Sequence, residues 1–556
     1  MKNKTLICGA LLLSLLLMAC STGGLSFGGK RVVVTMVYGS EKEAWLKPLV
    51  EQFNSERHKT AAGAAIEVQI TPMGSVESGE QIVAGTLNPT VWSPASSAYV
   101  PVVNTKWRQS HTDDLVVGAP NDLVLSPIVI AMWQPMAETL GWPDKPLGWA
   151  DIAQLAISPE GWAGYGFPEW GSFKFGHTHP EFSNSGLLAV IAEAYAGAGK
   201  QRGLTVQDAH DPQVITFMTE VESSIIHYGE STGFFATRMF ERGPSYLSAA
   251  VLYENLVVAQ QTKVLNNAVA QIPVVAIYPK EGTFWSNHPY IILNAPWVTE
   301  EQREAAQRFE DFLLDRPQQL KAMAYGFRPA DQTIALSAPL DTRHGVDPRQ
   351  PQTVLEMPNA EVITAIQEVW RTEAKKPVDL VVVMDISGSM KGEKINAARK
   401  SLLDFVNLLD DRDRLHVILF SDQIITLTPL SPLGEKRQDV LRRISGIIEG
   451  GDTRLYDAID TAYEALQTTG DPAHIRAIVA LTDGNDTAST LTLDQLLQKV
   501  GNLSEGGSAV KVFTIGFGSN ADKRVLTQIA EATGAKQYDS DPSTIQKVYT
   551  EIATFF

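Results

Sequence analysis

Runs of apolar residues alternate with amphipathic stretches along most of this chain, the pattern of domains that pack helices against a sheet. Residues 31–38 (RVVVTMVY) form a continuous apolar run, as expected of a strand buried on both faces. Ser40 follows at once and is predicted to begin a helix over residues 40–53. Thr299 and Gln302 form the capping box of another helix. Further strands are predicted at residues 65–71, 126–133 and 272–278.

A second alternating block occupies residues 378–556. Its strands are predicted at residues 379–384, 414–420, 475–482 and 510–515, and its helices at residues 394–409, 438–448, 455–468, 522–532 and 542–554. This order is typical of a doubly wound sheet, in which sites lie at the carboxyl ends of the strands. Both blocks are therefore expected to be α/β. Between them, residues 328–377 are polar and rich in proline, with one helix predicted at residues 360–373, and form either a linker or an extension of the first block.

The first nineteen residues have the layout of a bacterial secretion signal. Lys2 and Lys4 precede an apolar stretch that is too short to cross a bilayer comfortably. The stretch ends in Leu17-Met18-Ala19-Cys20, which resembles the lipobox of bacterial lipoproteins, although Met18 is slightly unusual there. We therefore expect residues 1–19 to be removed, Cys20 to carry the lipid and residues 20–30 to act as a flexible tether. An ordinary secreted protein or an uncleaved anchor is the alternative.

The cysteine content and the net charge limit the kinds of site and partner that this chain can have. The 556 residues include two cysteines, Cys8 and Cys20, so residues 21–556 contain no disulfide or thiolate metal site. Lys and Arg number 46 against 63 Asp and Glu, a net charge of −17, and nothing in the sequence suggests a nucleic-acid partner. Because of the predicted leader and lipid attachment, the expected location is the extracytoplasmic side of a membrane, in the periplasm or on the cell surface.

Oxygen-bearing side chains follow the first strand of the second block. Asp385, Ser387 and Ser389 alternate in the sequence DISGS, and this spacing lets one carboxylate and two hydroxyls converge on one point. Thr453 begins a predicted helix and Asp483 ends another apolar strand, so both are expected at the same edge of the sheet. An all-oxygen ligand set suits a hard divalent cation such as Mg²⁺.

Because of these five residues, the block from Val378 to Phe556 resembles the von Willebrand factor A domain and its metal-ion-dependent adhesion site. The resemblance implies a doubly wound, Rossmann-like fold and a bound Mg²⁺, or another divalent cation such as Mn²⁺ or Ca²⁺. It also implies that Ser387, Ser389 and Thr453 are the inner ligands, supported by Asp385 and Asp483. A carboxylate of an acidic protein partner would complete the coordination. No general base is visible beside the loop, so we expect no catalysis.

The first block, residues 31–327, resembles the two-lobed bacterial extracellular solute-binding proteins that serve ABC importers. The resemblance depends on the leader, on the opening strand and helix, and on about 300 residues of interleaved strands and helices. It implies a periplasmic-binding-protein-like fold with a solute or oxyanion between the lobes. Polar residues at strand-to-helix turns, where free N–H groups favour anions, are the candidate ligands: Ser40, Ser75, Ser97, Asn184, Ser185 and Glu254. Each serine could equally be a helix cap.

His177 and His179 could place two imidazoles on one side of a strand as a metal pair. No third ligand is evident nearby in the sequence, so they are interpreted as a polar rim or the wall of the cleft. Together the patterns predict an envelope-anchored lipoprotein that binds a solute in its first domain and an acidic protein partner through Mg²⁺ in its second. Two alternatives stay open: an ABC-importer receptor whose second domain only docks it to the permease, and an adhesion or scaffold protein without a small ligand.

Overall fold

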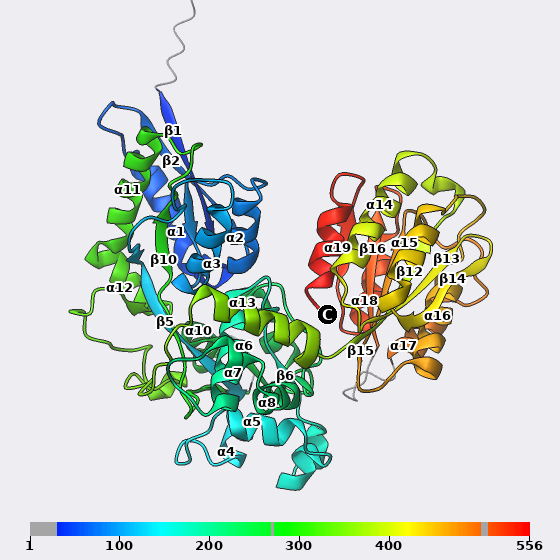
Figure 1. The fold of residues 1–556 in the computed structure, drawn as a ribbon, viewed down its shortest axis with the longest axis horizontal. Coiled ribbons are helices and arrows are strands. Elements are labelled where there is room, and N and C mark those ends of the chain that lie inside the picture. The colour runs from blue at the N-terminus through cyan, green and yellow to red at the C-terminus, as the bar shows by residue number, and fades with distance from the viewer. Residues whose placement is uncertain (1–29, 268–271, 502–509) are drawn as a thin grey trace, which may run out of the picture.

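The computed structural model describes residues 30–267, 272–501 and 510–556. The predicted leader, the predicted lipid attachment site Cys20 and most of the predicted tether lie outside these described residues. Within them, no helix combines the length and the apolar composition needed to cross a bilayer. Figure 1 shows two lobes of a first unit on the left, with the second unit beside them on the right.

The first lobe is a sheet with the strand order β2-β1-β3-β10-β4. Strands β1 and β2 pair in parallel over their whole length, so the predicted opening strand is confirmed. The strands are β1 (Arg31–Tyr38), β2 (Ala65–Pro72), β3 (Val91–Ser93), β4 (Asn121–Asp122) and β10 (Pro289–Ile292). The helices are α1 (Glu43–Glu56), α2 (Ser75–Val83), α3 (Val100–Trp107), α11 (Glu300–Leu314) and α12 (Arg316–Ala324). Side chains of α1 and α11 form one apolar core with those of β1 and β2.

Local sequence explains how these helices begin. The hydroxyl of Thr299 accepts from the N–H of Gln302, and the amide oxygen of Gln302 accepts from the N–H of Thr299. This is the predicted capping box, and it starts α11. Ser40 differs from its prediction because residues Ser40–Lys42 form a short 3₁₀ turn and α1 starts only at Glu43.

The second lobe is built on β5, which pairs antiparallel with β7 and β8. The chain enters this lobe through β5 and returns to the first through β9, which pairs with β5, and then β10. Its strands are β5 (Val124–Trp133), β6 (Phe175–Gly176), β7 (Ala249–Tyr253), β8 (Val274–Ile277), β9 (Trp285–Ser286) and β11 (Arg328–Pro329). Its helices are α4 (Gln134–Thr139), α5 (Trp149–Ala156), α6 (Asn184–Ala198), α7 (Val206–Ala209), α8 (Pro212–Glu222), α9 (Thr232–Arg242) and α10 (Glu254–Leu265).

The proline-rich segment that follows β11 lies along the second lobe. The N–H of Leu355 donates to the carbonyl of Thr283, and the carbonyl of Gly345 accepts from Ala276. Helix α13 (Ala360–Val369) packs on α6 and α7 of the second lobe and on α3 of the first, and continues into one π-helical turn, Trp370–Ala374. The segment thus adds backbone pairing to the second lobe and a helix that contacts both lobes before the chain enters the second unit.

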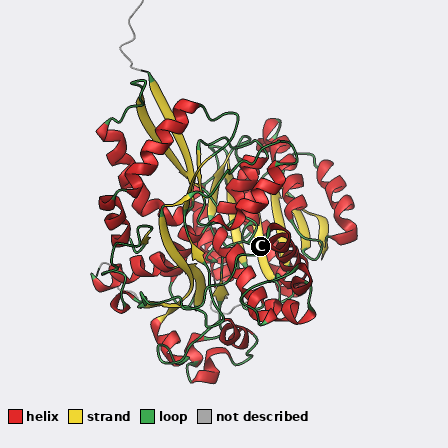
Figure 2. Ribbon diagram, turned by 60° about the vertical axis from the view of Figure 1, so that its left-hand side comes forward, coloured by secondary structure: helices red, strands yellow, loops and turns green. Residues whose placement is uncertain are grey.

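The second unit, residues 378–556, is a sheet with the order β14-β13-β12-β15-β16-β17 and helices on both faces (Figure 2). Leu380 and Val382 of β12 face a core with α14, α15 and α19, whereas Val381 and Val383 face a core with α16, α17 and α18. The strands are β12 (Val378–Asp385), β13 (Arg414–Phe420), β14 (Ile424–Pro432), β15 (Ile475–Thr482), β16 (Lys511–Phe517) and β17 (Gln537–Ser540). The helices are α14 (Glu393–Leu408), α15 (Arg437–Ser445), α16 (Leu455–Thr469), α17 (Leu493–Gly501), α18 (Lys523–Ala532) and α19 (Ile545–Ala553).

The predicted doubly wound sheet is confirmed, including the parallel pairing of β12 with both β13 and β15. The sequence patterns missed β14, β17 and α17. Strand β14 pairs antiparallel with β13 at the edge of the sheet and is largely exposed, so it has no continuous apolar run to reveal it.

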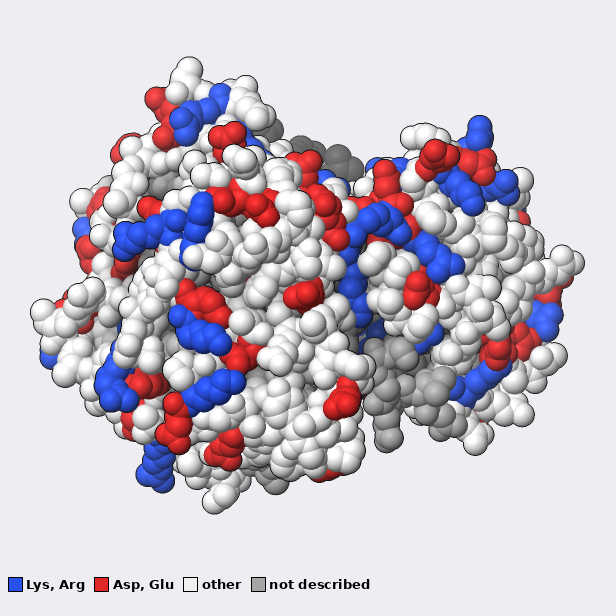
Figure 3. Space-filling model, turned by 60° about the horizontal axis from the view of Figure 1, so that its bottom comes forward, with Lys and Arg blue, Asp and Glu red and all other residues white. Residues whose placement is uncertain are grey.

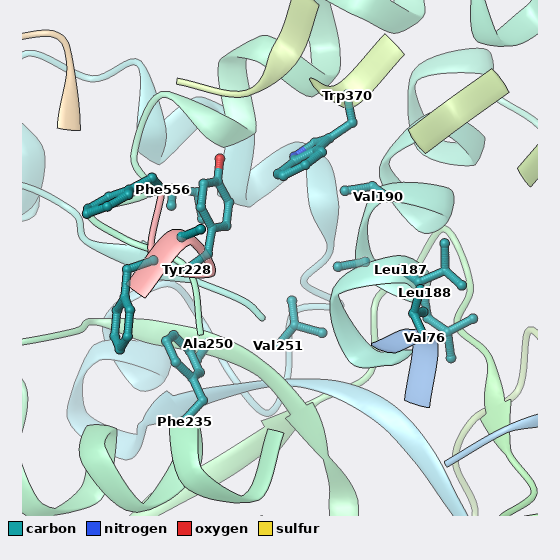
Figure 4. Close-up of a cluster of buried hydrophobic side chains, with 14 of the residues drawn as sticks. Val76, Leu187, Leu188, Val190, Tyr228, Phe235, Ala250, Val251, Trp370 and Phe556 are labelled. Atoms are coloured by element: carbon teal, nitrogen blue, oxygen red, sulfur yellow. The ribbon is translucent and has the colours of Figure 1, made fainter. Parts of the chain in front are cut away.

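The two units meet through residues that follow α19. The carbonyl of Phe555 accepts from the N–H of Tyr228 in the second lobe, and the ammonium of Lys375 donates to the carbonyl of Phe556. Figure 4 shows Phe556 beside Tyr228, with Trp370 on the other side of Tyr228. All three side chains are buried, so the contact is an apolar packing interface with directed hydrogen bonds. On the face drawn in Figure 3, acidic and basic side chains are interspersed, as on an ordinary solvated surface.

Candidate functional site

The five predicted metal-site residues lie at the carboxyl edge of the second unit's sheet. Strand β12 ends at Asp385 and its parallel neighbour β15 ends at Thr482, just before Asp483. Met384 and Leu481 are partners in the register of these strands, so the two following loops leave the sheet side by side. This is the arrangement that the doubly wound pattern predicts.

A chain of short hydrogen bonds joins the two loops. The hydroxyls of Ser387 and Ser389 lie 3.0 Å apart, and Ser389 donates to Asp483 Oδ1 at 2.6 Å. Asp385 accepts from the N–H of Ser387 at 2.8 Å and from the hydroxyl of Thr482 at 2.6 Å. Both oxygens of Asp385 therefore accept hydrogen bonds from the protein itself.

The third loop brings Thr453 to the same place. The N–H of Gly388 donates to the carbonyl of Gly451 at 3.0 Å, which ties this loop to the serine loop. A Cβ placed on Gly484 would lie 4.0 Å from the hydroxyl oxygens of both Ser389 and Thr453. All five predicted residues thus gather around one point, although they are separated by up to about a hundred positions in the chain.

Charge at this edge is balanced by a lysine that the sequence patterns did not single out. The carboxylates of Asp385 and Asp483 are fully buried, and burial raises the pKa of Asp385. Lys394, near the start of α14, forms an ion pair with Asp483 Oδ2. The donor set consists of two carboxylates and three hydroxyls, so the residues present fit a hard divalent cation.

In the first unit, a layer of polar side chains joins the two lobes. We call it the interlobe layer; it comprises Ser40, Ser96, Asn184, Ser231 and Tyr253. Ser40 of the first lobe donates to Ser231 of the second at 2.9 Å. Ser96 donates to the amide oxygen of Asn184 at 2.6 Å, and the amide nitrogen of Asn184 donates to Tyr253 at 2.9 Å. Every member is buried, so the lobes are in direct polar contact.

Three charged or ionisable side chains lie buried beside this layer. Glu41 and Lys42 pair at 2.9 Å, and His288 Nδ1 lies 3.3 Å from both partners. Although burial raises the pKa of Glu41, Lys42 and His288 lower it to about 2. Burial and the nearby Lys42 lower the pKa of His288 to about 4, so the imidazole is neutral near pH 7. No sequence pattern pointed to this trio, because none of its members lies on a recognisable motif.

Several polar atoms in the same region have no hydrogen-bond partner among the described residues. They are Tyr38 Oη, Ser93 Oγ, Ser286 Oγ and His288 Nε2, all in buried side chains. Buried polar groups without partners are uncommon in folded proteins and often mark where a ligand or water binds.

The remaining predicted solute ligands lie in or near this region but bond within their own lobes. Ser75 accepts from the N–H of Ala95, and Ser185 bonds to Thr178 and Thr232. Ser97 accepts from the side-chain amide of Asn287. Glu254 is held by Arg328, whose guanidinium donates to both carboxylate oxygens. The structure therefore places Ser40 and Asn184 each in a separate hydrogen bond across the lobes, and Glu254 in a buried ion pair.

The interpretation of His177 and His179 as a polar rim is wrong, while their interpretation as the wall of the cleft stays a prediction. Both are buried, at 0% and 5% exposure. His179 packs against Trp370, and burial lowers its pKa well below the ordinary value. His177 bonds to Glu222, a residue of α8 that lies 45 positions along the chain. That separation explains why no partner was evident in the sequence.

Comparison with known protein families agrees with this geometry. Residues 34–328, more than half of the chain, match the model of the family described as "Bacterial extracellular solute-binding protein". The chain belongs to this family. Residues 379–551 match the von Willebrand factor type A domain, so the solute-binding domain is followed by a VWA domain. Both matches are to families of binding domains.

Individual relatives are distant. Over 318 residues the chain is 23% identical to inter-alpha-trypsin inhibitor heavy chain H4 of Sus scrofa, a match that covers 54% of this chain and 33% of that protein. The human H4 chain is 25% identical over 291 residues, which cover 50% of this chain and 30% of that protein. The chain thus spans about a third of the length of these relatives.

Solved structures resemble each part separately. A periplasmic thiamin binding protein is 12% identical, with a TM-score of 0.43, and the match covers 61% of this chain and 96% of that one. A von Willebrand factor type A protein from Catenulispora acidiphila is 21% identical, with a TM-score of 0.30, covering 33% of this chain and 42% of that one. Identities this low concern the fold alone.

Proposed function

We propose that the VWA domain binds Mg²⁺ through Ser387, Ser389 and Thr453, supported by Asp385 and Asp483, and through the ion an acidic protein partner. The observation that carries the proposal is the convergence of these five oxygen-bearing side chains at one edge of the sheet. A bound Mg²⁺ would supply a Lewis-acidic centre that attracts a carboxylate. Ser389 and Asp483 orient each other, while Asp385 holds the serine loop through the N–H of Ser387. The role is binding rather than catalysis.

Mg²⁺ titration of the purified protein, followed by calorimetry, tests the metal step without knowledge of the partner. Asp385→Asn removes one charge and replaces the oxygen that accepts from the hydroxyl of Thr482 by an amide nitrogen, and we expect it to weaken Mg²⁺ binding about 10–100-fold. Asp452→Asn is the matched control, because Asp452 is exposed in the same loop as Thr453 and forms no part of the site. Equal Mg²⁺ affinity in both variants would contradict the proposed ligand set.

We further propose that the solute-binding domain captures a small polar solute or an oxyanion at the interlobe layer. The unpartnered atoms of Tyr38, Ser93 and His288 support this location, because a polar ligand would supply the hydrogen bonds that they lack. Ser40 and Asn184 would contribute from opposite lobes, and Ser75, Ser97 and Ser185 from the adjacent turns. Glu254 would act through Arg328, the guanidinium with which it pairs.

Calorimetric titration with sulfate, phosphate and glucose tests the proposed capture of a solute at the interlobe layer. A Ser40→Ala variant is expected to weaken binding of whichever probe is captured, while Ser55→Ala, on the exposed end of α1, leaves it unchanged. Binding that is identical in the two variants would place the solute elsewhere. Failure of every probe would favour the adhesion or scaffold alternative.

The membrane location is proposed from the leader and from the family. We infer that Cys20 anchors the protein to the extracytoplasmic side of a membrane, which mass spectrometry of the mature N-terminus would test. The ABC-importer alternative is favoured by the family match of the first domain. It predicts that solute uptake in cells survives Asp385→Asn, whereas the metal-dependent proposal predicts that partner docking fails.

A further inference from the structure

A second group of metal-ligating side chains lies inside the solute-binding domain, away from the VWA domain's sheet edge. His177 follows β6, Glu193 lies on α6 and Glu222 ends α8. One ligand atom from each lies within 4.8 Å of the other two, and all three side chains are fully buried. The group therefore combines one imidazole and two carboxylates that have no exposure to bulk solvent.

Two of the three residues are held in place by neighbours that would serve as outer partners of a metal site. His177 Nδ1 donates to the carbonyl of Thr178 at 2.7 Å, which directs Nε2 toward Glu222 Oε1 at 2.9 Å. Trp370 Nε1 donates to Glu222 Oε1 at 2.9 Å, and the hydroxyl of Tyr228 donates to Oε2 at 2.6 Å. Such hydrogen bonds are the ones that fix ligand orientation in protein metal sites.

Glu193 lacks the hydrogen-bond partners that hold the other two residues. Neither of its carboxylate oxygens has a hydrogen-bond partner, although the side chain is completely buried. Burial, together with the neighbouring Glu222, raises its pKa well above the ordinary value. The ammonium of Lys376, which lies near Glu222, donates instead to the carbonyl of Ile225. A buried carboxyl without a partner is destabilising unless another group satisfies it.

We propose that His177, Glu193 and Glu222 bind a first-row divalent transition metal, with Zn²⁺ as the representative ion. A divalent cation would balance the two buried carboxylates and give Glu193 the partner it lacks. The imidazole ligand favours Zn²⁺ over Mg²⁺, which prefers oxygen ligands and retains its water. This site is independent of the proposed Mg²⁺ site, because it shares no residue with it.

The location gives the ion a structural role. Glu222 holds Trp370 on the segment that leads to the VWA domain, and Tyr228 contacts Phe555 after α19. Figure 4 shows Trp370 and Tyr228 facing each other in this buried cluster. A metal at Glu222 would therefore stabilise the region where the two domains meet.

The test uses the purified protein carrying Asp385→Asn, so that the VWA site contributes little metal. After chelator treatment and dialysis against Zn²⁺, inductively coupled plasma mass spectrometry should find one Zn²⁺ per chain. Adding Glu193→Gln, which preserves volume, should weaken Zn²⁺ binding at least tenfold and abolish the rise in melting temperature on Zn²⁺ addition. Glu310→Gln removes a buried carboxylate in the first lobe and should leave both readouts unchanged.

Zinc content that is the same with and without Glu193→Gln would overturn the proposal, as would displacement of the bound Zn²⁺ by millimolar Mg²⁺. A second measurement avoids dependence on a variant that fails to fold. Anomalous scattering at the zinc edge from crystals of the parent protein should give a peak between His177 and Glu193. A Zn²⁺-soaked crystal without that peak would equally overturn the assignment.

Discussion

The metal edge of the VWA domain and the interlobe layer of the solute-binding domain are both polar, yet they are assembled differently. The metal edge comes from three loops that leave one sheet on the same side, and Ser389 is exposed there although Ser387 is buried. The interlobe layer is buried and depends on two lobes that the chain connects by crossing from β4 into β5 and returning through β9.

This difference has a thermodynamic consequence. A hydrogen bond of an exposed hydroxyl such as that of Ser389 can be exchanged for one with water, whereas a buried polar group that loses its partner pays its full desolvation free energy. The interlobe layer should therefore contribute more to stability, and the metal edge should contribute more to binding of a cation. Three changes test this contrast.

The largest expected effect is on the interlobe layer. Asn184→Ala would leave Ser96 Oγ and Tyr253 Oη without the partner they share, and we expect a loss of about 2–4 kcal/mol in the free energy of unfolding. Ser389→Ala at the metal edge should lose less than about 1 kcal/mol, because its position is open to water. Urea denaturation of both variants measures the difference, and equal losses would remove the contrast.

Acid should act mainly on the buried Glu41, Lys42 and His288 beside the interlobe layer. Because the pKa of His288 is about 4 in the folded protein and near 6.5 in the unfolded chain, the unfolded state takes up a proton first as the pH falls. The contribution of His288 to the free energy of unfolding is fully present above pH 6.5. It decreases by roughly 1.4 kcal/mol per pH unit as the pH falls to 4. Glu41, with a pKa of about 2, loses its stabilising contribution only below about pH 4.5.

Comparing the free energy of unfolding of the parent protein with that of His288→Asn at pH 7, 6 and 5 isolates the contribution of His288. Asparagine is chosen because residue 288 has a φ of 40°, which asparagine tolerates. The stability difference between the two proteins should shrink as the pH falls. A difference that stays constant from pH 7 to pH 5 would show that His288 does not titrate as its burial implies.

The smallest effect concerns the metal edge. Lys394→Met removes the ammonium that pairs with Asp483, and the half-exposed position can accept an uncharged side chain of similar length. We expect Mg²⁺ affinity to increase a few-fold, because the cation no longer competes with the lysine. Lys391→Met, an exposed lysine in the same loop region, is the control. Weaker Mg²⁺ binding in Lys394→Met would mean that the lysine helps to order Asp483 instead.

Much of the fold was predictable because its signals are local. The apolar runs of β1, β13 and β15 and the capping box at Thr299 each lie within a few residues of sequence. The five residues of the metal edge could also be found, since parallel strands of one sheet bring their carboxyl ends together. Lys394 was missed because its pairing with Asp483 joins positions 89 residues apart without a motif.

By itself, then, the sequence determined two α/β domains and the gathering of Asp385, Ser387, Ser389, Thr453 and Asp483, because strand periodicity and loop position suffice for both. Only the tertiary structure decided which polar groups are buried together. It placed Glu41 beside His288, and Glu193 and Glu222 beside His177, by packing elements that lie far apart in the chain. Burial and pairing across such distances depend on how whole lobes and helices pack, and no local pattern of residues encodes them.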